Sequence, residues 1–300
     1  MKNQPIVTKS QIVQDLRALG LFQGHTIMLH ASVKKIGWVV GGPDVVIESI
    51  LDVLTLSGTL MMFASWEDNT YDLARWTKER QDAYIRERPS YDPKRSRADS
   101  REMGILTEYL RTWPGAYRSR HPFSYVAVGE RAKWITDNHP WQYSDGPGSP
   151  LEKLCEVGGL VLILGSPIGS VTLLHHSEHL ADVPNKKVDR YRMPVLQDGQ
   201  RVWMDFEEYD TTRGIVDWPD DYFETIVKEY LTTGNGRTGR VAGADSYLFE
   251  AKSIAAFGVK WMEEHFNGNA RQQSLAADAE DGAAEGSRPD INLKKKSFYI

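Results

Sequence analysis

The stretch GGLVLILGSPIGSVTLLHH, residues 158–176, decides how the fold is interpreted. It begins with a short apolar run, residues 160–164, which is typical of a strand buried on both faces of a sheet. The Gly, Pro and Ser residues that follow predict a turn, and helical spacing begins after Ser170, the expected N-cap. The stretch therefore predicts a strand, a turn and a helix in succession, as in α/β folds.

The same alternation runs through most of the chain. Helical spacing is found in KSQIVQDLRALGL (9–21), GPDVVIESILDVL (42–54), MGILTEYLRTW (103–113) and SPLEKLCEV (149–157), and strand-like runs are TIMLHASV (26–33), GTLMMFASW (58–66) and YVAVG (125–129). Further on, YRMPVLQDGQRVWMDF (191–206) predicts a hairpin turning at Asp198 and Gly199, so we expect an antiparallel piece to join the sheet. We predict an α/β fold with a mixed sheet and helices on both faces.

The length of 300 residues allows one large domain or two small ones, and we interpret residues 1–268 as a single domain. Residues 67–101 are polar, charged and interrupted by prolines, which predicts a long loop or insertion of the kind that is often functional. Residues 269–300 contain few large apolar side chains before the last three residues. That composition predicts a disordered tail.

Composition argues against several classes of partner. A net charge of -5 argues against nucleic acid, which needs a clustered excess of Lys and Arg. The first ten residues lack the apolar segment of a signal peptide, and no run of about 18 apolar residues occurs. Cys155 is the only cysteine, and its amphipathic surroundings predict a core residue rather than a reactive thiol. We therefore expect a cytoplasmic protein with no nucleic-acid or membrane partner.

Three histidines and a glutamate lie within five residues, 175–179, on the helix expected after the turn. Thr172, His175 and Glu178 are three residues apart and share one face of that helix. Glu178 is thus placed to accept the proton of one ring nitrogen of His175, leaving the other nitrogen to act as a base. Spacing alone leaves open that the histidines simply fill the core or the surface.

A zinc site is the weaker interpretation of the same residues. His175 and His179 have the four-residue spacing of two zinc ligands. The metalloprotease motif, however, needs Glu directly after the first His, where this chain has His176, and a third ligand would have to come from His121 or His30. We therefore expect no metal and keep a zinc hydrolase as a minor alternative.

Several segments, taken together and in order, resemble the aminoglycoside 3-N-acetyltransferases. They are MLHASVKKIGWVVGG, GTLMMFASW, YDP, RSRHPFSYVAVG, GSPLEKL, LILGSPIGSVTLLHHSEHLADVPNK and YLFEAKSIAAFGVKWMEEHF, and they extend from about residue 8 to about residue 266. The resemblance implies an α/β fold distinct from the GNAT fold. It also implies transfer of the acetyl group of acetyl-CoA to the 3-amino group of a 2-deoxystreptamine aminoglycoside, which makes the cell resistant to the antibiotic.

The resemblance assigns roles to residues of this chain. The family's Thr-x-x-His-x-x-Glu pattern falls on Thr172, His175 and Glu178, which implies His175 as general base, Glu178 as its orienting partner and Thr172 beside CoA or the thioester. The residues implied in CoA binding are Ser32, Lys34, Lys35, Ile36, Gly37, Val39 and Ser124. Lysine suits the phosphates of CoA as a point charge.

A polycationic acceptor needs carboxylates, and an aromatic face adds a cation–π contact. The residues implied in acceptor binding are Trp66, Glu67, Asp68, Asp72, Asp92, Glu208 and Asp210. The nearest alternative keeps fold and cosubstrate but acetylates a metabolic amine instead of an antibiotic; a binding protein without turnover is a further alternative. The choice among aminoglycosides, and between monomer and homodimer, stays open.

Overall fold

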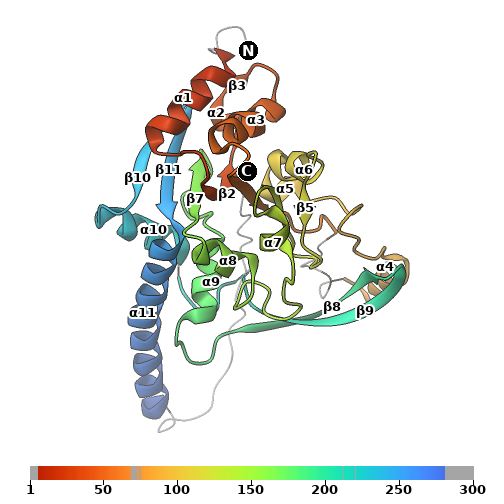
Figure 1. Cartoon of the computed structure of the whole chain (residues 1–300). Helices are drawn as coiled ribbons and strands as arrows, with labels where there is room; N and C mark the ends of the chain where they lie inside the picture. The colour runs from red at the N-terminus through yellow and green to blue at the C-terminus, as the bar shows by residue number, and fades with distance from the viewer. Residues whose placement is uncertain (1–5, 69–72, 74–75, 212, 220, 281–300) are drawn as a thin grey trace.

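The computed structural model describes residues 6–68, 73, 76–211, 213–219 and 221–280, with side chains as far as Asn267. A seven-stranded sheet in the order β10-β11-β7-β2-β4-β6-β5 forms its centre (Figure 1). Its strands are β2 (Thr26–Ala31), β4 (Thr59–Phe63), β5 (Tyr117–Arg118), β6 (Tyr125–Gly129), β7 (Leu160–Leu164), β10 (Arg237–Val241) and β11 (Ala244–Glu250). β2 runs parallel to β4 and β7, and the outer pairs are antiparallel, which confirms the predicted mixed sheet.

Helices cover both faces of this sheet because the central strands are apolar on both sides. Within β2, Met28 packs into a cluster with α8, α9, α10 and α11, whereas Leu29 packs on the other face with α1, α3 and α6. The helices are α1 (Lys9–Leu19), α2 (Val33–Ile36), α3 (Pro43–Leu54), α5 (Ser100–Met103), α6 (Ile105–Arg111), α7 (Ala132–Thr136), α8 (Pro150–Glu156), α9 (Leu173–Leu180), α10 (Tyr222–Thr232) and α11 (Ala251–Glu280). β1 (Ile6–Val7) and β3 (Trp38–Val39) form a small parallel pair.

The predicted hairpin is present but does not join the sheet. β8 (Val188–Gln197) and β9 (Gln200–Tyr209) are antiparallel, and both turn residues, Asp198 and Gly199, have the positive φ that a tight hairpin turn needs. They form a separate two-stranded sheet, so our expectation that this piece joins the main sheet is wrong. The apolar side chains of the hairpin pack instead with Trp66 and Tyr91 in a cluster of their own.

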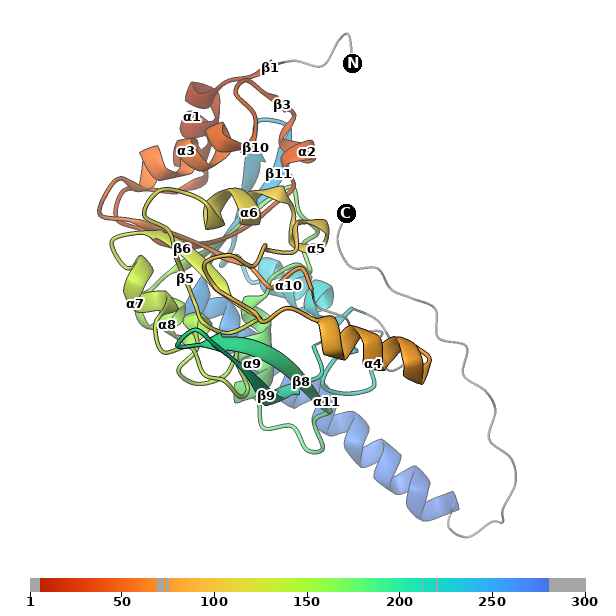
Figure 2. The same cartoon turned by 90° about the vertical axis from the view of Figure 1, so that its right-hand side faces the viewer.

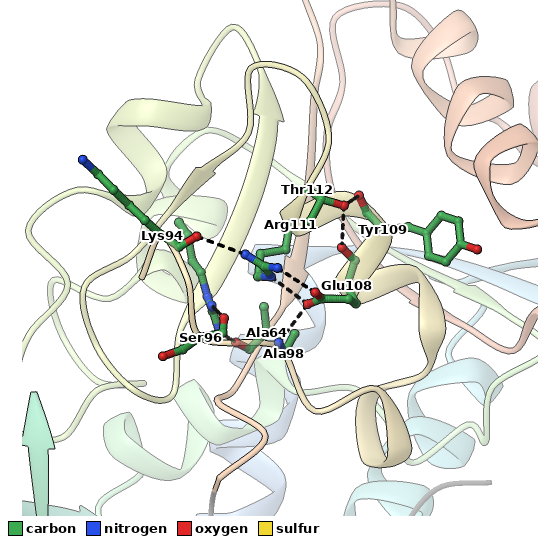
Figure 3. A network of polar contacts seen from close by, with 9 residues as sticks. Ala64, Lys94, Ser96, Ala98, Glu108, Tyr109, Arg111 and Thr112 are labelled. Atoms are coloured by element: carbon green, nitrogen blue, oxygen red, sulfur yellow. Dashed lines mark hydrogen bonds and ion pairs between the residues drawn. The ribbon is translucent and has the colours of Figure 1, made fainter. Parts of the chain in front are cut away.

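The described part of the polar segment 67–101 includes a helix that we did not predict, α4 (Lys78–Glu87). Its periodicity is weak because none of its residues is buried. Figure 2 shows α4 beside the β8–β9 hairpin, where Arg201 donates a hydrogen bond to the carbonyl of Ile85. At its end the segment bonds to α6: the Lys94 carbonyl accepts from Arg111, and the Ala98 N–H donates to Glu108 (Figure 3). The Ser96 carbonyl accepts from Arg118 of β5.

The ends of two helices bear on what we expected from the sequence. Thr172, not Ser170, stands at the N-cap of α9, because the Ser170 hydroxyl donates to the Pro167 carbonyl within the preceding turn. α11 extends as far as Glu280. The disordered tail expected over residues 269–300 stays a prediction, and residues 281–300 lie outside the described residues. Over the described residues, no helix combines the length and apolar character that crossing a bilayer demands.

Candidate active site

The site lies at the carboxyl edge of the parallel strands, the usual place for ligands in open α/β sheets. The Ser32 N–H donates to the Leu164 carbonyl at 2.9 Å, which joins the loop after β2 to the end of β7. Gly165, with φ of 69°, continues the chain there, and a Cβ atom on it would stand 2.6 Å from Lys35 Cβ. The implied CoA segment, residues 32–39, and the turn that leads to α9 are therefore adjacent.

His175 and Glu178 form the polar centre of the site. His175 Nδ1 lies 2.6 Å from Glu178 Oε2, the contact that their spacing predicts. Glu178 is only 1% exposed, whereas the His175 side chain remains 21% exposed. Burial by itself lowers the pKa of His175, but the carboxylates of Glu178, Asp145 and Asp221 outweigh it and raise that pKa. The arrangement holds one ring nitrogen on a buried carboxylate and keeps the ring reachable.

Tyr222 is a third member of this centre that sequence reasoning missed. Its hydroxyl donates a hydrogen bond to Glu178 Oε1, the oxygen that His175 does not use. Asp145 and Asp221, which act on His175 through their charge, were missed as well. These residues come from the loop before α8 and from the start of α10, and no motif in the sequence connects them to α9.

The other histidines have separate surroundings. His176 Nδ1 lies 2.8 Å from the Asp145 carbonyl, and His179 packs against the rings of Tyr143 and Tyr209. Burial, with smaller effects of His175, His176 and Lys186, lowers the pKa of His179 to about 3. No group of three or more His, Cys, Asp or Glu side chains within the described ranges could hold a metal ion. The zinc alternative therefore has no ligand set in this part of the chain.

His30 and His121, the two possible third ligands, lie apart from each other. His30 follows Met28 on the sheet face that carries α9, and its buried Nε2 has no hydrogen-bond partner among the described residues. Burial, followed by the charge of His175, lowers the pKa of His30 to about 4. His121 is fully buried beside His139 and Phe206, and its Nε2 stands 3.7 Å from Glu208 Oε1.

Most of the implied CoA residues belong to α2 and the residues beside it. Lys34 and Lys35 are exposed on α2, and Thr172 is half-buried one turn ahead of His175. Ile36 and Val39 are core residues, and their carbonyls accept the N–H groups of Gly243 and Gly42. Gly37 has a φ of 119° at the end of α2. Ser124 is buried: its hydroxyl donates to the Ala64 carbonyl, just after β4, and accepts a bond from Arg118.

The implied acceptor residues divide into three groups. Glu67 is exposed, and Asp68 pairs with Arg88 and Tyr84 near the buried ring of Trp66. Asp92 caps its own turn by accepting the Lys94 N–H. Glu208 and Asp210 are buried: Glu208 accepts the Ser144 N–H and Asp210 accepts from Arg213. Asp72 lies outside the described residues.

Glu208 and Asp145 lie close together in the interior. Burial, followed by the charge of Asp145, raises the pKa of Glu208 to about 8. The carboxyl group of Asp145 accepts the Tyr125 hydroxyl at 2.6 Å and also acts on His175. Glu208 is therefore connected to the candidate base through Asp145, although it does not face solvent.

Comparisons with known proteins identify the family of this chain. The sequence pattern described as Aminoglycoside 3-N-acetyltransferase matches residues 28–263. Aminoglycoside N(3)-acetyltransferase III of Pseudomonas aeruginosa is 44% identical over 265 residues, covering 88% of this chain and 96% of the relative. The structure of AAC-IIIb as a binary complex with CoASH has a TM-score of 0.81 at 43% identity, covering 87% of this chain and 98% of the other.

A further solved structure is that of AAC-VIa bound to sisomicin, with a TM-score of 0.81 at 32% identity, covering 87% of this chain and 99% of the other. The fold of this chain is thus shared with acetyltransferases of the same type. By sequence and by structure, the chain belongs to the aminoglycoside 3-N-acetyltransferases, a family of acyltransferases.

Proposed function

We propose that this enzyme acetylates the 3-amino group of 2-deoxystreptamine aminoglycosides with acetyl-CoA, and that His175 is the general base. The observation that carries the proposal is the 2.6 Å contact between His175 Nδ1 and buried Glu178. With Nδ1 donating its proton to the carboxylate, the lone pair of the imidazole is on Nε2. A sugar amine is largely an ammonium near neutral pH, so a base near the thioester supplies what the reaction lacks.

The ammonium first loses one proton to solvent, which frees the lone pair of the amine for attack. His175 then carries the one proton that remains to be transferred: Nε2 takes it from the neutral amine as the nitrogen bonds to the acetyl carbon of acetyl-CoA. Glu178 stabilises the imidazolium that results. His175 then returns the proton to the sulfur as the carbon–sulfur bond breaks, which releases CoA as the thiol and restores the base. No covalent link to the enzyme is needed, since holding amine and thioester in one complex provides the orientation.

The position of the CoA segment supports this assignment. Residues 32–37 lie against the turn that begins α9, and exposed Lys34 and Lys35 are suited to phosphate. AAC-IIIb, similar to this chain, binds CoASH, and AAC-VIa binds sisomicin. For the cationic acceptor we favour Glu67 and Asp68, because they follow β4 at the same sheet edge as His175. Glu208 and Asp210 are buried, so in this proposal they support the acceptor site from the interior and do not contact the acceptor.

The direct experiment measures thiol release from acetyl-CoA with a panel of 2-deoxystreptamine aminoglycosides, for the wild type, His175→Ala and a matched control, His265→Ala. His265 lies on α11 and bonds to the carbonyl of Trp261. We expect His175→Ala alone to lose turnover while keeping CoA binding. NMR of the product identifies the acetylated nitrogen. Near-normal turnover of His175→Ala would refute the role of His175 as the base. If the folded wild type turns over no member of the panel, the acceptor is an amine other than an aminoglycoside.

A further inference from the structure

Both oxygens of the Glu178 carboxylate have a hydrogen-bond partner, and His175 is only one of the two partners. Its Oε2 meets His175 Nδ1 at 2.6 Å, and its Oε1 accepts the hydroxyl of Tyr222. The carboxylate is 1% exposed, so water does not replace either partner. A buried carboxylate with two donors has one stable orientation, because each oxygen is committed to its own partner.

The Tyr222 hydroxyl is itself fixed as a donor. It accepts the backbone N–H of Ile215 at 3.3 Å, so its single proton is left for Glu178. Gly214, with φ of 84°, allows this approach, since a Cβ atom there would stand 2.8 Å from the Tyr222 ring. The ring also packs against Phe223 and Phe266. Burial and the charge of Glu178 raise the pKa of Tyr222 well above its ordinary value, which keeps the hydroxyl protonated.

We propose that Tyr222 is a positioning residue of the acetyl transfer, which acts on His175 through Glu178 by fixing the orientation and charge of that carboxylate. The inference rests on the proposed role of His175 as the base. Tyr222 lies 44 residues from Glu178 in the chain, at the start of α10, so this contact exists only in the folded protein. In this role Tyr222 keeps His175 and Glu178 in the arrangement needed for catalysis before substrates bind.

The negative charge of Glu178 decides in which direction loss of the Tyr222 hydroxyl shifts the titration of His175. The Tyr222 hydroxyl stabilises the Glu178 carboxylate most while His175 is neutral. Once His175 and Glu178 together hold one more proton, that proton stabilises the carboxylate, so losing the hydroxyl then costs much less. Removing the hydroxyl therefore makes the pair take up its proton at higher pH. The other titratable groups around the pair stay in place: Asp145, Asp221, His30, His179 and Lys186.

Tyr222→Phe removes only the hydroxyl, and Tyr230→Phe is a matched control. Tyr230 is buried on the same helix and donates to Ser253, away from the pair. The readout is the titration of the His175 imidazole by NMR, with its signals identified by their loss in His175→Gln. We expect the titration of His175 to move to higher pH in Tyr222→Phe and to stay unchanged in Tyr230→Phe. In turnover, kcat should fall roughly 10- to 100-fold in Tyr222→Phe alone.

A second variant keeps the packing intact. Replacing Tyr222 by 3,5-difluorotyrosine makes its hydroxyl a stronger donor, and the His175 titration should then move to lower pH. An unchanged titration in both substitutions overturns the inference, as does an equal shift in Tyr230→Phe. These titrations need no substrate, so they decide the role of Tyr222 even if the aminoglycoside panel shows no turnover and the proposed function fails.

Discussion

Replacing Glu178 by glutamine keeps the shape of the side chain but gives it one acceptor end and one donor end. Tyr222 decides their orientation, because its proton points at the Oε1 position. The amide oxygen takes that place, and the NH₂ group then faces His175 Nδ1, which is 2.6 Å from Oε2 in the wild type. Nδ1 becomes an acceptor and the ring proton moves to Nε2, the nitrogen that should take the proton of the amine.

The size of the loss in kcat follows from the free energy needed to restore the His175 tautomer that has its proton on Nδ1 and its lone pair on Nε2. In that tautomer the Nδ1–H and the amide N–H face each other, and each is a buried donor without an acceptor. At about 1–3 kcal/mol for each unsatisfied group, the two together cost about 2–6 kcal/mol. Since about 1.4 kcal/mol changes a rate tenfold, kcat should fall roughly 30- to 20,000-fold. The loss then approaches that of His175→Ala instead of being the milder one that the missing charge alone suggests.

The assay compares kcat for thiol release in Glu178→Gln, Tyr222→Phe and the double variant. Without the hydroxyl of Tyr222, no proton holds the amide oxygen in place, so the amide can rotate and offer that oxygen to the Nδ1–H. We therefore expect the double variant to be faster than Glu178→Gln. A double variant that is slower still, or a Glu178→Gln enzyme within about threefold of the wild type, would refute the tautomer argument.

Four further predictions follow from the same structure. First, the carboxylates around His175 raise its pKa, so kcat/KM should fall as pH decreases through a value above the ordinary 6.5, measured as a pH–rate profile with saturating acetyl-CoA. Second, burial raises the pKa of Glu208 to about 8, so the folded state binds a proton more tightly than the unfolded state and its stability falls as pH rises from about 4.5 to 8; Tm of Glu208→Gln should decline less over this range than that of the wild type. Third, Glu67→Gln should raise KM up to about fivefold for the most highly charged aminoglycosides without lowering Tm, because Glu67 is exposed. Asp68→Asn should lower Tm, because the charge of buried Arg88 loses its carboxylate and keeps only the Asp68 backbone carbonyl as acceptor. Equal KM effects on all acceptors would contradict charge recognition. Fourth, burial raises the pKa of Cys155 to about 12, so this thiol should react with a thiol reagent much more slowly in the native protein than in denaturant.

The sequence predicted those helices and strands that bury one or both faces in the core. The apolar run at β7 and the spacing in α1 and α3 predict their elements because burial imposes a period on the sequence. The exposed helix α4 leaves no such period and was missed. The hairpin of β8 and β9 was predicted from its turn, but its separation from the sheet was not, since pairing partners depend on elements far along the chain.

The contact between His175 and Glu178 was determined by the sequence alone, because three residues along one helix bring two side chains together whatever surrounds the helix. The tertiary structure alone decided that Tyr222 holds the other oxygen of Glu178, and that Asp145 and Asp221 bring their charges to His175. It likewise turned Ser124, Glu208 and Asp210 inward. The physical reason is that a helix fixes the distance between neighbours in sequence, whereas contacts between distant segments depend on how whole elements pack.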